Sequence, residues 1–167
     1  YADVSNKSAF MFIKEINKVY NNLKQVKNQY GISPVIHIHI NTYGGCLYSG
    51  FCIVDEIEKI QKKGIEVYTY CEGKVASAGT LISIVGSKRF IGNNAVMLIH
   101  QLSSSFWGKF NEIEDDFENC NMLMKKLKNL YKKNTNFRKK KLDNLLKRDI
   151  WLESKDCLEY GLVDEII

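Results

Sequence analysis

The chain has 167 residues, of which 45% are hydrophobic, and a formal net charge of +5 at neutral pH. This length suffices for a single domain, residues 1–167, that buries a core without disulfides or metals. The apolar runs are far too short to span a membrane, and no signal-peptide pattern opens the chain. We therefore expect a soluble, cytoplasmic protein with no membrane partner.

The cysteines indicate a reducing compartment. Their number is odd, they are scattered, and no close C-x-x-C pair occurs, which argues against a disulfide framework and a zinc site. We expect five free thiols, at Cys46, Cys52, Cys71, Cys120 and Cys157. His37 and His39 share one face of a predicted strand, but no third ligand accompanies them, so neither a metal nor a cofactor is predicted.

The first predicted elements are a helix and a strand. Residues 6–29 carry apolar side chains at helical spacing, which predicts an amphipathic helix that ends before Gly31. Residues 35–40 alternate strictly between apolar and other side chains, which predicts a strand with Ile36, Ile38 and Ile40 on one face.

A second helix and strand follow the tight turn predicted at Gly44-Gly45. Residues 51–63 have helical periodicity and are closed by Gly64, and residues 65–71 alternate again as a strand would. The apolar stretch 77–85 is too long for most strands. It predicts a buried helix with Ser77 at its N-terminus.

The next two predicted strands, 88–91 and 95–100, are separated by Gly92-Asn93-Asn94, a sequence typical of hairpin turns. We expect these strands to pair with each other. Strands and helices alternate through most of the chain, which predicts an α/β architecture with a largely parallel sheet.

Positive charge gathers near the end of a long helix predicted at about 109–133. Residues 121–148 hold eleven Lys and Arg against the single Asp143. Such a segment could bind nucleic acid, or it could be the solvated end of a helix, where basic residues favour the dipole. Few aromatic side chains are interleaved with these lysines, so we predict no nucleic-acid partner.

Two local contexts suit acyl-transfer chemistry. Ser77 lies among small residues at a predicted strand-to-helix junction, where amides of the first helical turn can face developing negative charge. Gly44-Gly45 follows a strand and can present a bare backbone N–H. Taken separately, Ser77 could be a plain helix cap and the glycines an ordinary turn.

A histidine and an aspartate could complete such a site. His100 ends an apolar strand where a sheet meets its loops, and Asp149 follows Arg148 near the end of the chain. A lone histidine in this position is more often a hydrogen-bonded core residue, and a lone aspartate a surface carboxylate. Neither residue decides the function by itself.

Four motifs together resemble ClpP, the proteolytic subunit family of the Clp proteases. The segment 40–45, I-N-T-Y-G-G, resembles that family's I-N-S-P-G-G turn, and 73–79, G-K-V-A-S-A-G, resembles its G-x-A-A-S-M-G nucleophile segment. The segment 96–101 resembles its M-I-H-Q segment, and Arg148-Asp149 with the ending E-Y-G-L-V-D at 159–164 completes the set in the family's order.

The resemblance implies a fold and a set of site residues. The fold is the crotonase-like repeated β-β-α superhelix with a projecting handle helix, here about 109–133. The implied catalytic triad is Ser77, His100 and Asp149, with the amides of Gly45 and Ala78 as the oxyanion hole. A peptide substrate would add as a strand between two segments, contacting Gly44, Cys46, Leu102, Ser103 and Ser104.

The resemblance also implies partners. These are further copies of the chain, in heptameric rings stacked as a tetradecamer, and an unfolded protein or peptide as substrate. A Clp-type ATPase partner is implied as well, but His37, His39 and Glu72 disfavour it, because they put polar groups where the family docks an apolar anchor.

Two other functions stay open at this point. A crotonase-type acyl-CoA enzyme shares the fold and the oxyanion hole but uses carboxylate acid-base chemistry, and the Ser77, His100 and Asp149 set argues against it. A non-catalytic ring subunit would usually lack a triad member, whereas this chain has all three.

Overall fold

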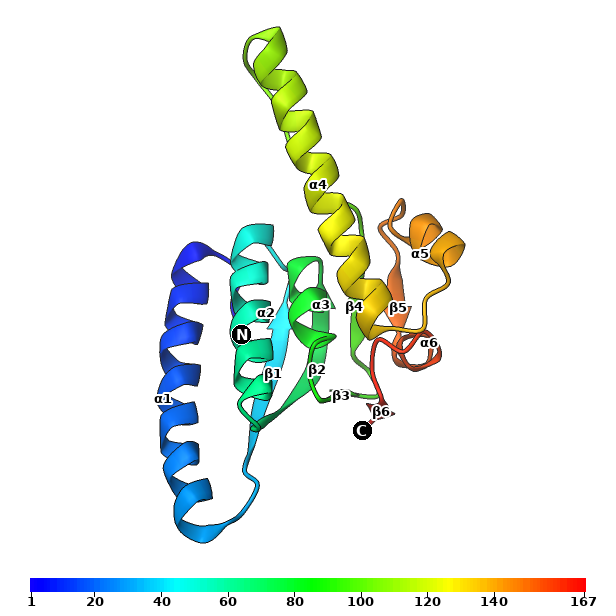
Figure 1. The fold of residues 1–167 in the computed structure, drawn as a ribbon. Coiled ribbons are helices and arrows are strands. Elements are labelled where there is room, and N and C mark those ends of the chain that lie inside the picture. The colour runs from blue at the N-terminus through cyan, green and yellow to red at the C-terminus, as the bar shows by residue number, and fades with distance from the viewer.

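A six-stranded sheet organises the computed structural model, which describes residues 1–167 (Figure 1). Helices and strands alternate, so the chain has the mixed α/β architecture expected from the sequence. The helices are α1 (Asn6–Tyr30), α2 (Leu47–Lys62), α3 (Ala78–Ser83), α4 (Phe110–Asn134), α5 (Lys139–Leu145) and α6 (Ser154–Glu159). The strands are β1 (Val35–Thr42), β2 (Glu66–Ala76), β3 (Lys88–Ile91), β4 (Val96–Leu98), β5 (Trp151–Glu153) and β6 (Glu165–Ile166).

Strand β2 is the centre of the sheet. It pairs with β1 in parallel along one edge, and along its other edge it pairs first with β3 and then with β4, also in parallel. Gly73 lies between the segments that pair with β3 and β4, and its φ of +64° is one that L side chains rarely adopt. This single long strand therefore connects the two halves of the molecule.

The prediction of a hairpin at Gly92-Asn93-Asn94 is wrong. β3 and β4 do not pair with each other, because each one pairs in parallel with a different part of β2. The turn closes locally through a hydrogen bond from the Ala95 amide to the Gly92 carbonyl. It moves the chain from one segment of β2 to the next instead of reversing it.

Helix α1 matches the amphipathic helix predicted at its place. Ser5 caps it, because the Ser5 side chain accepts from the Ser8 amide, and Gly31 ends it in the left-handed conformation with φ 68°. Ile16 and Tyr20 are the large buried side chains of α1, and they join one continuous hydrophobic core. α1 lies beside α2, and α2 packs against the sheet at β2 (Figure 1).

The alternation predicted for β1 is also confirmed. Ile36, Ile38 and Ile40 are buried in the core, whereas His37 and His39 are exposed on the opposite face of the sheet. There His39 stacks on Tyr70 with ring centroids 4.8 Å apart. The strand therefore has one apolar face and one face of polar rings.

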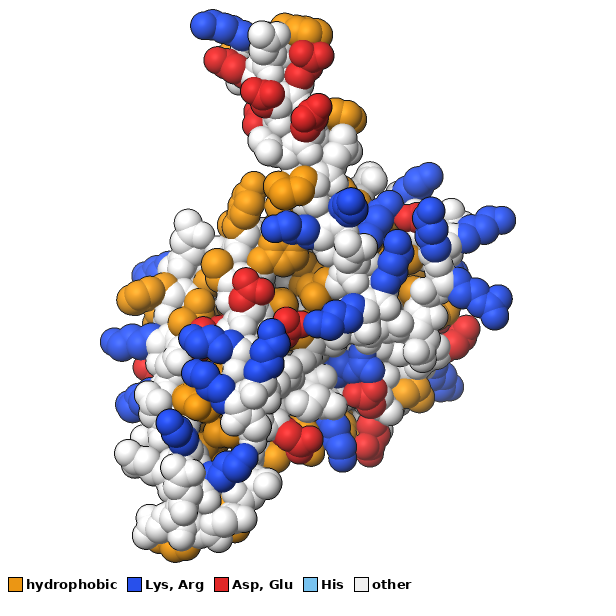
Figure 2. Space-filling model, in the orientation of Figure 1, with side chains coloured by type: hydrophobic (Ala, Val, Ile, Leu, Met, Phe, Trp, Pro, Cys, Tyr) orange, Lys and Arg blue, Asp and Glu red, His pale blue; other side chains and the backbone are white.

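Helix α4 is buried only near its C-terminal end. Leu123, Leu127 and Tyr131 are its buried residues, and its first half projects away from the sheet (Figure 1). Acidic and apolar side chains cover the projecting end (Figure 2). None of the helices combines the length and apolar character that a bilayer crossing requires.

Candidate active site

Ser77 occupies a strained turn between β2 and α3. Its φ of 54° and ψ of −126° make it the one residue other than glycine with a positive φ. Such a conformation costs on the order of 1–3 kcal/mol and persists only where the surroundings enforce it. The Ser77 amide donates to the Leu98 carbonyl at 2.9 Å, which ties the turn to the end of β4. A sharp strand-to-helix turn of this kind presents a serine hydroxyl away from the sheet.

Gly44 permits this turn by leaving room beside it. A Cβ on Gly44 would lie 2.6 Å from the Ser77 Cβ and 2.7 Å from the Ala76 carbonyl oxygen. Gly45 is equally confined, since a Cβ there would lie 2.2 Å from the Val4 carbonyl oxygen. Both glycines also have positive φ, of 94° and 137°. The close approach of two backbone segments at Ser77 therefore requires glycine at both positions.

The Gly45 and Ala78 amides are free to bind an oxygen atom. The Val4 amide donates to the Gly44 carbonyl, and the Val4 carbonyl accepts from the Cys46 amide, each at 2.7 Å. The Gly45 N–H between them has no partner in the chain. Ala78 is the first residue of α3, so its N–H has no acceptor within the helix. Ala78 follows Ser77 directly, and Gly45 follows the Gly44 that packs against Ser77, so both free donors lie close to this residue.

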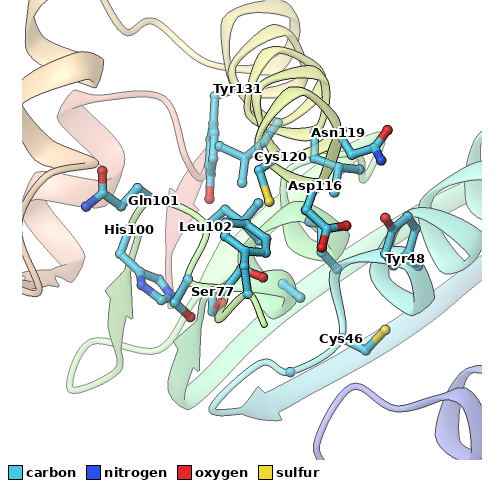
Figure 3. A pocket seen from close by; sticks show the side chains of 18 residues that line it. Cys46, Tyr48, Ser77, His100, Gln101, Leu102, Asp116, Asn119, Cys120 and Tyr131 are labelled. Atoms are coloured by element: carbon cyan, nitrogen blue, oxygen red, sulfur yellow. The ribbon is translucent and has the colours of Figure 1, made fainter. Parts of the chain in front are cut away.

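His100 lies beside Ser77 in space, just beyond the end of β4. Figure 3 shows its imidazole next to the Ser77 side chain. The His100 Nδ1 lies 3.5 Å from the Asp149 Oδ1, and the His100 side chain is 27% exposed whereas that of Asp149 is 81% exposed. This separation is longer than the ~2.7–2.9 Å of a charge-assisted hydrogen bond, so the two side chains form a loose ion pair.

A cavity of about 350 Å³ joins these groups. Ser77, His100, Gly45 and Ala78 all line it. Four of the five predicted substrate-binding residues line it as well, namely Cys46, Leu102, Ser103 and Ser104. Gly44 and Asp149 do not line the cavity, but Gly44 packs against Ser77 and Asp149 lies next to His100.

Helix α4 supplies a wall that the sequence did not indicate. Asp116, Cys120, Leu123, Leu127 and Tyr131 line the cavity from this helix. Their spacing of three or four residues marks one helix face, which was visible in the sequence, but nothing local tied that face to Ser77.

The floor of the cavity contains a buried polar contact. The hydroxyls of Tyr131 and Thr80 are hydrogen-bonded, and the Thr80 hydroxyl also reaches the Ser77 carbonyl oxygen at 2.6 Å. Burial raises the pKa of Tyr131, so its hydroxyl stays protonated. These contacts support Ser77, the residue that precedes α3.

Cys46 presents a thiol at the edge of the cavity, at the N-terminus of α2. Hydrogen bonding by the Ser49 hydroxyl and then by the Ser49 and Tyr48 amides lowers the pKa of Cys46. The Ser49 hydroxyl also donates to the Asn6 side-chain oxygen at 2.7 Å. Its one proton cannot serve the Asn6 oxygen and the Cys46 sulfur at the same time. We therefore regard the two amides as the fixed donors to Cys46. All five cysteines are free. No group of three or more His, Cys, Asp and Glu side chains is arranged to hold a metal ion.

Comparison with known proteins gives the family. The Clp protease family model matches residues 13–167. The chain belongs to the Clp protease family. Among solved structures, a mutant of ClpP1 from Listeria monocytogenes superposes with a TM-score of 0.84 at 26% sequence identity, covering 100% of this chain and 88% of that chain. This match confirms the ClpP-like fold that the four motifs implied, and it makes the cavity at Ser77 the candidate active site of a Clp protease family member.

Proposed function

We propose that this member of the Clp protease family is a serine endopeptidase with Ser77 as nucleophile, His100 as general base and Asp149 as the residue that orients His100. The arrangement of His100 carries the proposal. Its Nδ1 faces the Asp149 carboxylate, so an N–H at Nδ1 leaves the lone pair of Nε2 for a proton acceptor role, and the ring lies next to Ser77 (Figure 3). Family membership makes peptide hydrolysis the relevant reaction class.

The proposed reaction has two halves. In the first, the Ser77 Oγ attacks the scissile carbonyl carbon while His100 Nε2 takes the hydroxyl proton, and the resulting imidazolium returns that proton to the leaving amine. In the second, a water molecule gives its proton to His100 and attacks the acyl-serine, and the imidazolium then returns that proton to the Ser77 Oγ as the acid leaves, which restores Ser77 and His100. Asp149 stabilises the imidazolium in both halves.

The tetrahedral oxyanion would be bound by the amides of Gly45 and Ala78. Gly45, Ala78 and Ser77 line the same cavity, and neither of the two amides donates within the chain. Each donor of this type typically contributes roughly 3 kcal/mol of transition-state stabilisation. A substrate added as a strand would lie between Cys46 and the Leu102–Ser104 segment, both of which line the cavity.

The same proposal includes an assembly of heptameric rings stacked as a tetradecamer, with unfolded chains or peptides as substrates. The projecting end of α4 supports it. Trp107 is 99% exposed and Phe110 74% exposed, and Phe117 extends the same apolar surface. A single chain rarely leaves such large apolar groups together in water, and further copies would cover them.

A Clp-type ATPase is disfavoured as a partner by the polar face of β1 and β2. On the exposed face of β1 and β2, His39 forms an ion pair with Glu72, with 2.7 Å between His39 Nδ1 and Glu72 Oε1. The Glu72 pKa is lowered by the hydrogen bonds of Tyr1 and then His39. An apolar anchor docked on this face would have to displace or bury an ionised carboxylate, which disfavours binding.

Labelling with a fluorophosphonate probe tests the proposed activity. We expect stoichiometric modification of Ser77 together with hydrolysis of an unstructured peptide, and loss of both in Ser77→Ala. Labelling without hydrolysis by the assembled protein would support a non-catalytic ring subunit. Absence of labelling, combined with binding of acyl-CoA, would replace the protease by a crotonase-type enzyme.

A further inference from the structure

The cavity beside Ser77 changes in polarity from its floor to its mouth. Cys120, Leu123 and Leu127 give α4 an apolar surface inside the cavity. One turn closer to the projecting end, Asp116 also lines the cavity, and its carboxylate points into the space between Tyr48 and Leu102 (Figure 3). Asp116 is the one Asp or Glu among the lining residues, and no Lys or Arg lines the cavity.

The Asp116 carboxylate has no cationic partner in the chain. None of the ion pairs includes it. The positions three and four residues away on the helix are Glu112, Ile113, Asn119 and Cys120, so no basic side chain can reach it along α4. An unpaired anion therefore faces the space in which a substrate side chain would lie.

We propose that Asp116 makes this cavity selective for a lysine or arginine side chain of the substrate, a specificity that rests on the proposed peptidase function. A lysine side chain has a four-carbon stem that can lie on the apolar wall and an ammonium group that can reach the carboxylate at the mouth. Arginine has the same division and two donors for a bidentate contact. An acidic side chain would meet repulsion, and an apolar one would cover Asp116 without pairing it.

The surrounding charge strengthens this preference. Glu112, Glu114, Asp115 and Glu118 lie within one turn or so of Asp116 on the projecting end of α4. These charges lie roughly within the ~8–10 Å Debye length of physiological salt, so they add to the negative potential at the cavity mouth. The preference for a cationic side chain should accordingly weaken as ionic strength rises.

Peptide binding to the Ser77→Ala variant tests the proposal without requiring turnover. Fluorescent peptides matched in all but one residue carry lysine or norleucine in turn at each of the three positions before the scissile bond, and dissociation constants are measured by anisotropy at low salt. At one position we expect lysine to bind about tenfold more tightly than norleucine, the size of a single charge-assisted contact. Adding Asp116→Asn should remove that difference.

Asp115→Asn is the matched control, because it removes the same charge from the next residue of α4, which does not line the cavity. It should leave most of the lysine preference intact. Equal binding of lysine and norleucine at all three positions, no peptide binding at all, or a preference that survives Asp116→Asn would overturn the inference. Selective binding with no hydrolysis by the chain that retains Ser77 would refute the peptidase proposal and leave the Asp116 selectivity standing.

Discussion

Asp149 lies opposite His100 because the register of two short antiparallel strands places it there. β4 and β5 pair with Val96 opposite Glu153 and Leu98 opposite Trp151. Continuing that register by two residues beyond the strands brings position 100 opposite position 149. The ion pair between the two side chains is thus a consequence of backbone pairing, and the 81% exposure of Asp149 means that little side-chain packing holds it.

The first prediction concerns Asp149→Asn. Loss of the carboxylate removes the group that orients the His100 ring and stabilises its charged form, so we expect kcat to fall by about 10²- to 10⁴-fold with little change in KM. We expect the smaller fall in kcat within this range, because solvent partly screens a carboxylate as exposed as that of Asp149. Steady-state peptide hydrolysis measures the effect.

Asp55→Asn is the control for this change, since Asp55 is an exposed aspartate on α2 with no ion pair. It should keep wild-type kcat. Unchanged kcat in Asp149→Asn would remove Asp149 from the proposed triad.

The second prediction concerns the glycine behind the nucleophile. In Gly44→Ala the added Cβ would lie 2.6 Å from the Ser77 Cβ, at a φ of 94° that alanine rarely adopts. Relief of this contact must move the Ser77 turn, so we expect probe labelling of Ser77 and peptide hydrolysis to fall at least about 100-fold, as misplacement by about 1 Å does elsewhere.

Gly31→Ala separates backbone strain from displacement of Ser77. Gly31 has a φ of 68°, but a Cβ there meets nothing within 4 Å. This variant should lose about 1 kcal/mol of stability and no activity. Equal activity losses in the two variants would show that the effect at Gly44 is a general loss of folding.

The third prediction is a pH dependence of stability centred on Asp164. Burial opposes ionisation of this carboxyl, but the hydrogen bond and charge of Arg89 outweigh burial and hold the pKa of Asp164 below its ordinary value. Arg89 also donates to the Gly161 carbonyl at 2.8 Å, so the pair joins β3 to the segment before β6. Because the folded-state pKa is depressed, the pair stabilises the fold above the unfolded-state pKa, and this contribution is lost as pH falls through the folded-state value.

Denaturant unfolding at several pH values tests this dependence. Asp164→Asn should lower the free energy of unfolding at neutral pH by about 1 kcal/mol, a value reduced for a partly exposed pair, and the difference from wild type should shrink toward acid pH. Glu165→Gln is the control, because Glu165 takes part in none of the ion pairs, and it should show no such trend. A deficit in Asp164→Asn that stays constant with pH would contradict the assignment.

The sequence was sufficient where local pattern and motif coincide. The alternation of β1 follows from Ile36, Ile38 and Ile40 alone, and the apolar stretch that begins at Ser77 predicts the strand-to-helix turn at this residue. The roles of His100 and Asp149 came from a family resemblance, because their own surroundings fit a core histidine and a surface carboxylate equally well.

The remaining features depend on contacts between segments distant in sequence. Gly92-Asn93-Asn94 favours a local reversal, but the length of β2 offers separate partners to β3 and β4, and no turn residue reveals that. Asp116 looked like one of several acids that suit a helix N-terminus. Only the packing of α4 over the cavity shows that Asp116 lines it whereas Asp115 does not.

The two halves of α4 differ in burial. The C-terminal half packs on the core. Met124 belongs to this half, and its sulfur lies 3.2 Å from the Leu102 amide nitrogen. The N-terminal half is uncovered, with Phe110 74% exposed and Phe117 60% exposed. These two phenylalanines are seven residues apart on α4, so they lie on one face of the helix. They can therefore be changed without touching the core, whereas a charge at Met124 would disturb the cavity loop directly.

Replacing Phe110 and Phe117 together by Asp is expected to dissociate the proposed oligomer into a folded subunit with little peptidase activity. Two charges on an interface that buries aromatic side chains cost several kcal/mol per contact, enough to separate subunits at micromolar concentration. Activity should fall when the oligomer dissociates, because the loop that carries Leu102 and Ser103 leads directly into the projecting half of α4 and would lose its support.

Native mass spectrometry measures the assembly, circular dichroism the fold, and peptide hydrolysis the activity. Asn111→Asp adds a charge to another face of the same turn and should change none of the three. A double variant that stays assembled would show that α4 is not an assembly element, and a monomeric double variant with full activity would show that activity does not depend on assembly.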